Sequence, residues 1–213
     1  MKRTHLFGTL CVAVVAAPPA HASPKLPAHY AKLFELGRAW TYDVTYTSYL
    51  EAPAKVTRQR VSCTVTAVVD VPARGKVSKI ECTPSIDGEF VDRIYYAGPD
   101  GLHYADGGDG LPRDAEQLDD ATLRGVLIPP VPKPFRKVTV DTTWSPKGRA
   151  VEGIRAIAGG FCAYSEGSSV HPDSPDDTRC YTRDAGIASG SHRQLNKNYE
   201  LSFTLVGTTP PAR

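Results

Sequence analysis

The sequence predicts a mainly β protein, in which an antiparallel meander forms a curved sheet, a half-barrel or a sandwich. Apolar and polar residues alternate in many short segments, most clearly in "WTYDVTYTSYL" at 40–50 and "YELSFTL" at 199–205. This period of two is typical of strands with one buried face. Valine, threonine and tyrosine, which favour strands, are frequent in these segments. The turns between them are short and rich in glycine, proline and aspartate, so neighbouring strands are expected to run antiparallel.

The N-terminus has the layout of a secretory signal peptide. A basic start, "MKRTH", precedes the apolar run "LFGTLCVAVVAA" and the small residues of "PPAHA". We therefore expect residues 1–22 to be removed and residues 23–213 to form a single secreted or periplasmic β-rich domain. The apolar run is shorter than the roughly 20 residues of a membrane-spanning helix. No other segment approaches that length, so no membrane span is expected.

The charge of the mature chain argues against two classes of partner. The whole chain has 25 Lys and Arg against 23 Asp and Glu. The predicted leader holds two of the basic residues and none of the acidic ones, so the mature protein has no net charge. Without a cluster of Lys and Arg, it is a poor candidate for binding nucleic acid or an anionic membrane.

The first half of the mature chain, over 36–105, follows a short predicted helix. In "AHYAKLFELG" the apolar residues recur at helical spacing, and Gly37 suits the position just past a helix end, which predicts a short amphipathic helix within 23–38. Five strands are then expected, at 40–50, 55–71 and 76–83 and in the segments "EFVDRIYYAG" and "LHYAD".

The second half, over 135–207, follows a connection rich in proline and glycine. Residues 106–134 break the alternation, and one or two helical turns are expected near 114–124. The remaining strands are expected at 136–141, 149–158, 161–165, 178–183, 186–193 and 198–206.

Four cysteines remain after the leader, and an exported chain with four cysteines points to two disulfides with three possible pairings. Spacing favours Cys63 with Cys82 and Cys162 with Cys180. Alternation from Val61 through Cys63 to Val71 places these side chains on one face of a strand. A turn between Pro72 and Ala73 would then set Cys63 opposite Cys82. A zinc or redox site would usually show C-x-x-C, so we expect a scaffold role, no metal and no cofactor.

Signatures of known hydrolases are absent. The sequence has no G-x-S-x-G, no H-E-x-x-H and no G-x-x-x-x-G-K-[ST]. His103 alternates away from the apolar face and is expected to be solvated, and His192 in "SGSHRQ" is interpreted as part of a polar strand end. The Asp-rich segments "DGGDG" and "DSPDDT" lack the spacing of a calcium loop. Paired carboxylates leave no local signature, so an exported hydrolase remains an alternative.

The run "LGRAWTYDVTY" and a later "DTTW" resemble uncharacterised bacterial envelope proteins that open with a G-x-x-W-x-Y strand. In those proteins a twisted antiparallel sheet curls into a half-barrel, as in the periplasmic lipoprotein-carrier superfamily. The resemblance covers residues 36–50 and the general order of strands, and the cysteine pairs are not part of the carrier pattern. It implies a cup for an apolar ligand and carries over no ligand-binding residue.

The leading hypothesis for function is a secreted or periplasmic binding protein, without catalytic activity, for a lipid or another apolar small molecule. Trp40, Tyr42 and Tyr46 are the predicted ligand-binding residues, because soluble proteins seldom leave a large apolar face open without a use. The same face is ordinary core if strands from 136–206 cover it. An exported hydrolase with an unrecognised carboxylate or Ser/His site and an envelope protein–protein interaction module are the alternatives. The sequence does not indicate an oligomeric state.

Overall fold

In the computed structural model of the protein, eleven strands form one antiparallel sheet, in the spatial order β5-β4-β3-β2-β1-β11-β10-β9-β8-β7-β6. The structure describes residues 26–85, 91, 93–105, 111, 115–120, 128–141, 148–167, 176–194 and 198–212. The strands are β1 Ala39–Ser48, β2 Lys55–Val71, β3 Gly75–Thr83, β4 Ile94–Gly98, β5 Gly101–Ala105, β6 Phe135–Asp141, β7 Gly148–Ile157, β8 Gly160–Glu166, β9 Asp176–Thr182, β10 Gly186–Gln194 and β11 Tyr199–Thr209. The predicted leader lies outside the described residues.

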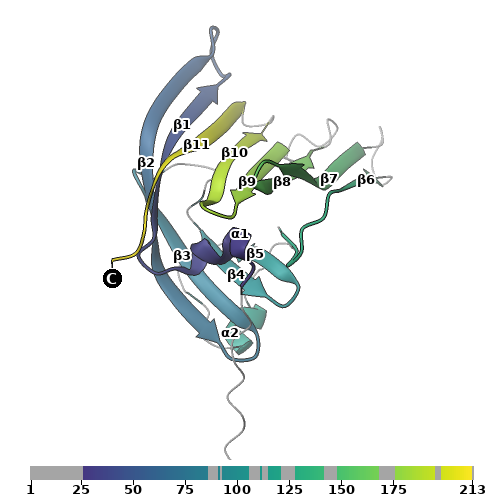
Figure 1. The fold of residues 1–213 in the computed structure, drawn as a ribbon. Helices are drawn as coiled ribbons and strands as arrows, with labels where there is room; N and C mark the ends of the chain where they lie inside the picture. Colours follow the sequence, from purple (N-terminus) through teal and green to yellow (C-terminus); the bar gives the residue numbers. More distant parts are fainter. Residues whose placement is uncertain are drawn as a thin grey trace, which may run out of the picture.

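The sheet curls along its width, as Figure 1 shows. β1 lies beside the central strand, β11, and pairs with both β2 and β11. The first half of the chain extends from β1 outward to β5, and the second half returns from the opposite outer strand, β6, inward to β11. The prediction of a mainly β protein built on a curved antiparallel sheet is confirmed.

Helices are few and short in the described part of the chain. α1 (Ala28–Ala31) continues into the 3₁₀ turn η1 (Lys32–Phe34), and α2 spans Ala115–Asp120. The helix predicted within 23–38 is thus confined to these two turns, which end before Gly37 at φ +80°. None of these helices is long and apolar enough to cross a membrane.

The short segment α1–η1 lies inside the curl of the sheet (Figure 1) and contacts β2, β3, β9 and β10. We call the face of the sheet that packs against it the concave face and the other the convex face. The concave face carries the main core, because Tyr30 and Leu33 from α1–η1 are buried there with the inward residues of the strands. The largest fully buried side chains are Trp40, Tyr30, Tyr42, Tyr95, Tyr181, Leu33, Ile80, Leu102, Ile128, Ile187 and Leu201.

The β2–β3 hairpin confirms the first predicted disulfide but reaches it by a different register. Val71 pairs with Gly75, so the turn is centred on Ala73 rather than between Pro72 and Ala73. Gly75 is needed there, since a Cβ on it would lie 2.0 Å from the carbonyl oxygen of Ala97. A turn centred on Ala73 would, by itself, leave Cys63 one residue out of register with Cys82. A β-bulge between Val65 and Ala67 takes up the extra residue.

The bulge has two consequences. Cys63 lies directly opposite Cys82 and is bonded to it, with the two Cα atoms 4.0 Å apart. The strand also changes face at the bulge, because a shift of one residue reverses the side-chain alternation. Val65 therefore packs in the concave core, whereas Val71 packs in a smaller cluster with Val77. The prediction that the alternating residues from Val61 through Cys63 to Val71 share one face is wrong for this reason.

The second predicted disulfide, Cys162–Cys180, is also confirmed and joins β8 to β9. Phe161 and Tyr181, which neighbour the two cysteines along their strands, belong to the concave core, and the two cysteines do not. Since neighbouring side chains of a strand point to opposite faces, this disulfide lies on the convex face. The first disulfide belongs to the concave core. The two disulfides therefore cross-link neighbouring strands on opposite faces of the sheet.

Candidate functional site

The concave face is closed at one end, which we call the covered end and define by Trp40 and Tyr42. Both side chains are buried, with exposures of 1% and 0%. The indole Nε1 of Trp40 donates a hydrogen bond to the carbonyl of Ala185 at 2.6 Å, and the phenol of Tyr42 donates to the carbonyl of Ile187 at 3.0 Å. The helical segment α1–η1 lies against this end, because a Cβ on Gly186 would be 3.8 Å from both Leu33 and Trp40.

Cover decreases along β1 towards its other end. Val44 is buried, whereas Tyr46, the next inward residue, is only partly buried and packs against the main core. The ring of Tyr46 stacks on that of Tyr199 at 5.4 Å, and the ring of His192 lies 5.8 Å from Tyr199. Beyond them Leu50 is 72% exposed. We call the group Tyr46, Tyr199 and His192 the rim.

All three sequence-predicted ligand residues lie on the concave face, since Trp40, Tyr42 and Tyr46 alternate inward along β1. They differ in what surrounds them. Trp40 and Tyr42 are enclosed and hydrogen-bonded to backbone, so they form the floor of the concave face. Tyr46 is the member of the set that a molecule arriving from solvent meets first.

A polar cluster lies between the floor and the rim, and its centre is Arg179 on β9. The Arg179 side chain is only 3% exposed. Its Nε lies 3.3 Å from Oδ2 of Asp177, and its Nη1 donates to the phenol oxygen of Tyr95 at 3.5 Å. Tyr95 is on β4, so this contact joins the two walls of the curl. The phenol of Tyr95 itself donates to the carbonyl of Val91 at 3.1 Å.

Tyr181 is the next inward residue of β9 after Arg179. Its side chain is completely buried and its ring stacks on Phe161 at 5.7 Å. The phenol oxygen has no hydrogen-bond partner among the described residues. Burial raises the pKa of this phenol and the nearby Tyr95 raises it further, while the positive charge of Arg179 opposes the rise. Tyr181 therefore stays neutral and can act as a hydrogen-bond donor.

Sequence reasoning missed Arg179, Tyr181 and Tyr95. In "DTRCYT" both sets of alternating residues contain a candidate for burial, Tyr181 in one and Cys180 in the other. Period-two alternation alone cannot decide which set faces inward. The burial of Arg179 depends on β4, which comes from a distant part of the chain.

The two interpretations of histidine need correction. His192, interpreted as part of a polar strand end, is 1% exposed and faces inward, with Nδ1 3.9 Å from Oδ1 of Asp177. His103 lies on the convex face, as alternation predicted, but it is 9% exposed rather than solvated. Its Nε2 lies 3.1 Å from both carboxylate oxygens of Asp100, and its ring stacks on Tyr96. The small convex cluster therefore covers it.

Among the residues that the structure describes, no group of three or more His, Cys, Asp or Glu is arranged to hold a metal ion. The Asp-rich segment "DGGDG" lies outside the described residues.

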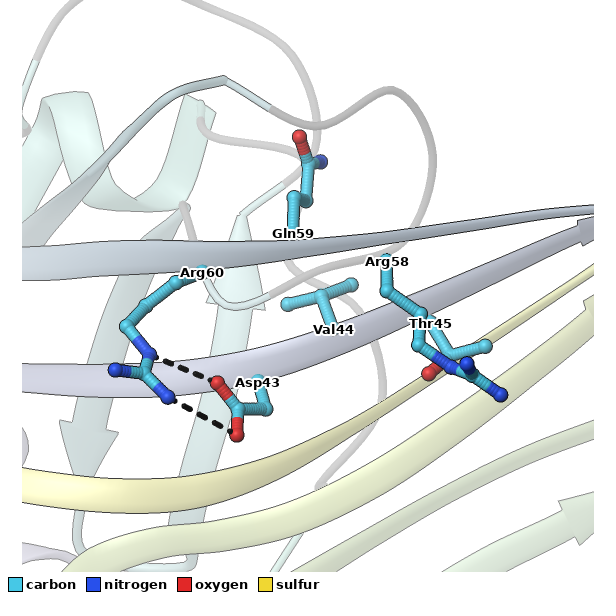
Figure 2. Close-up of a pocket in the computed structure, with 6 residues that line it drawn as sticks. All are labelled: Asp43, Val44, Thr45, Arg58, Gln59 and Arg60. Carbon is cyan, nitrogen blue, oxygen red and sulfur yellow. Dashed lines mark hydrogen bonds and ion pairs between the residues drawn. The ribbon is translucent and has the colours of Figure 1, made fainter.

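A shallow depression crosses β1 and β2, as Figure 2 shows. It is lined by Asp43, Val44, Thr45, Arg58, Gln59 and Arg60. Nε of Arg60 lies 2.9 Å from Oδ1 of Asp43, and a second contact joins Nη2 to Oδ2 at 3.4 Å. Both side chains are more than half exposed. Since water screens an exposed ion pair of this kind, Asp43 and Arg60 would contribute little to binding in the depression.

No protein-family model matches the chain, and no curated protein matches it. Among solved structures, the chain is similar to the crystal structure of a LolA superfamily protein from Nitrosomonas europaea. The two share 5% sequence identity, with 86% of this chain and 91% of that chain covered and a TM-score of 0.27. The function proposed below rests on the residues of this chain.

Proposed function

We propose that the protein is an exported, non-catalytic binding protein that takes up a lipid or another apolar ligand on the concave face of its sheet. The observation that carries the proposal is the difference in cover along β1. The same inward row of aromatic residues is sealed by α1–η1 at Trp40 and only partly covered at Tyr46. An apolar ligand would lie on the partly covered section, with Tyr46 and Tyr199 against it.

Tyrosine suits the rim of such a site. Its ring packs on an apolar chain while its hydroxyl keeps a polar partner. A ligand seated against Tyr46 would remove the remaining apolar surface of its ring from water, which contributes about 25 cal/mol for each Å² buried. The floor residues Trp40 and Tyr42 are already buried and hydrogen-bonded to backbone. They would shape the base of the site and contribute less to affinity.

Two disulfides support the exported location. Disulfides persist in oxidising compartments and are rare in the cytosol, and both cross-strand pairs are formed here. The signal peptide predicted over residues 1–22 agrees with this location, and N-terminal sequencing of exported protein should give Ser23 as the first residue. Recovery of a chain that keeps Met1 would contradict that processing.

Native mass spectrometry of the mature protein, purified without detergent, tests the proposed function. We expect a population heavier than the bare chain by the mass of a lipid, which organic extraction removes. The extracted protein should then bind a fluorescent fatty-acid probe in a saturable way. A preparation that carries no lipid and gives no saturable signal with the probe would overturn the proposal.

A further inference from the structure

The buried polar cluster of the concave face bears on the chemical class of the ligand. Arg179 places a permanent positive charge in a nearly dry environment, 3% exposed. Such a charge is costly to bury and needs negative or polar partners. Asp177 provides one at 3.3 Å, but the side chain of Asp177 is itself 25% exposed. The pair therefore reaches from the interior towards the rim.

The phenol of Tyr181 adds a second donor beside the guanidinium. Tyr181 and Arg179 alternate on the same face of β9, and the charge of Arg179 acts on the phenol of Tyr181. A completely buried hydroxyl without a partner among the described residues costs stability. An acceptor placed between the two side chains would satisfy it.

The surroundings of this pair are apolar on the side of β10 and β11. Gly190, which pairs with Arg179, has no side chain, and a Cβ there would lie 2.5 Å from the ring of Phe203. The ring of Phe203 therefore lies over Gly190, which is the neighbour of Arg179 on the adjacent strand β10. Leu201 and Tyr46 continue this apolar surface from Phe203 to the rim.

We propose that Arg179 and Tyr181 bind the head group of the ligand and that this head group is a single carboxylate. The ligand is thus a fatty acid or a similar long-chain monocarboxylic acid, with its chain directed along Phe203 and Leu201 to Tyr46. This inference rests on the proposed function. The positive charges of Arg179 and Arg93 both act on the phenol of Tyr181, and the carboxylate of Asp177 offsets one of them. The remaining positive charge and the neutral phenol match one negative charge, and bonds from both to a carboxylate are charge-assisted. The head group would replace the contact between Arg179 and Tyr95, which at 3.5 Å is long for a hydrogen bond.

The test compares palmitic acid with methyl palmitate, which has the same chain and no charge. Displacement of a fluorescent fatty-acid probe gives both affinities for three proteins: wild type, Tyr181→Phe and Tyr96→Phe. Tyr96 is the matched control, because its side chain is buried in the cluster on the convex face, and its phenol donates to the carbonyl of Arg74 at 3.0 Å. Wild type and Tyr96→Phe should bind the acid at least about tenfold more tightly than the ester. Tyr181→Phe should lose about tenfold in affinity for the acid, the effect of one bond to a charged group, and less than about threefold for the ester.

The outcomes separate the two proposals. If wild type binds neither ligand, the proposed function and this inference both fail. If wild type binds acid and ester alike, or if Tyr181→Phe keeps the preference for the acid, the apolar site stands and the carboxylate site is overturned. Thermal unfolding shows that the variants fold. The melting temperature of Tyr181→Phe should equal or exceed that of wild type, because the hydroxyl removed has no described partner.

Discussion

The two ends of β1 present the same alternation to the concave face and have different surroundings. At the covered end, Trp40 and Tyr42 are sealed by α1–η1 and bonded to carbonyl groups of Ala185 and Ile187. At the rim, Tyr46 contacts another aromatic ring and keeps part of its surface in solvent. The difference comes from what packs on β1: α1–η1, just before it in the sequence, and the Ala185–Ile187 segment, 145 residues later, cover one end. The alternation of a strand therefore predicts which side chains face inward. The packing of other segments decides whether those side chains form a closed core or a binding surface.

The largest effect should come from truncation at the covered end. Trp40→Ala removes a completely buried ring and its hydrogen bond to Ala185, and it should lower the free energy of unfolding by about 3–5 kcal/mol. Tyr46→Ala should lower it by less than about 1.5 kcal/mol, because less surface is buried there. Urea unfolding of both variants measures the difference. Equal losses would show that the rim is ordinary core.

Removal of the disulfide at the covered end should have the next largest effect. Cys63 pairs with Trp40 across β1 and β2 as well as with Cys82. Replacing both cysteines of this pair by alanine should lower the free energy of unfolding by about 3 kcal/mol, because the disulfide closes a loop between residues 19 apart in sequence. The convex pair Cys162–Cys180 should cost about the same by loop closure and should leave probe binding unchanged. Peptide mapping under non-reducing conditions must recover these two pairings, and a crossed pairing would refute the hairpin register.

Single hydroxyl groups offer a finer comparison. Tyr42→Phe removes a hydrogen bond to the Ile187 carbonyl and leaves that acceptor buried, which should cost about 1 kcal/mol. Tyr181→Phe removes a buried hydroxyl without a described partner and should cost nothing. Thermal unfolding monitored by circular dichroism measures both. A larger loss for Tyr181→Phe than for Tyr42→Phe would mean that the Tyr181 hydroxyl is already satisfied in the ligand-free protein.

The smallest predicted effect is a dependence on pH at the covered end. His29 of α1 packs edge-on against Phe161 at 5.0 Å. Burial, and then the charge of Arg183, lower the pKa of His29 from 6.5. In the folded state the imidazole resists protonation, so its contribution to stability is present above pH 6.5 and is lost as the pH falls towards the lowered pKa. His29→Gln should therefore reduce the fall in melting temperature between pH 7 and pH 5. If the melting temperature depends on pH in the same way in both proteins, the imidazole of His29 is solvated and this interpretation is wrong.

The sequence predicted the parts of the fold that depend on local pattern. Alternation along β1 identified the inward faces of Trp40 and Tyr46, and cysteine spacing identified both disulfides. The bulge between Val65 and Ala67 was not predictable, because "TVTAVV" has strand-forming residues at every position and nothing local selects the one left unpaired.

The candidate site was less predictable than the fold, because it is assembled across the curl. Arg179 is buried by its position opposite Tyr95, 84 residues away in sequence. His192 is enclosed by Tyr199 and Asp177 from neighbouring strands. Polar residues on a strand are normally interpreted as solvated, and only the curvature of the sheet reverses that expectation here.

The most direct test of the central claim is the affinity of a fluorescent fatty-acid probe for Tyr46→Ala beside Tyr49→Ala. Tyr49 is the matched control, since it is a tyrosine near the same strand end, 48% exposed and bonded to Glu200 outside the main core. If the concave face binds an apolar ligand, Tyr46→Ala should weaken probe binding about tenfold, as expected for loss of one aromatic contact. Tyr49→Ala should bind as wild type does, and both variants should keep nearly the wild-type melting temperature. A protein that never binds the probe, yet unfolds readily on Tyr46→Ala, would contradict the account and make this face a closed core.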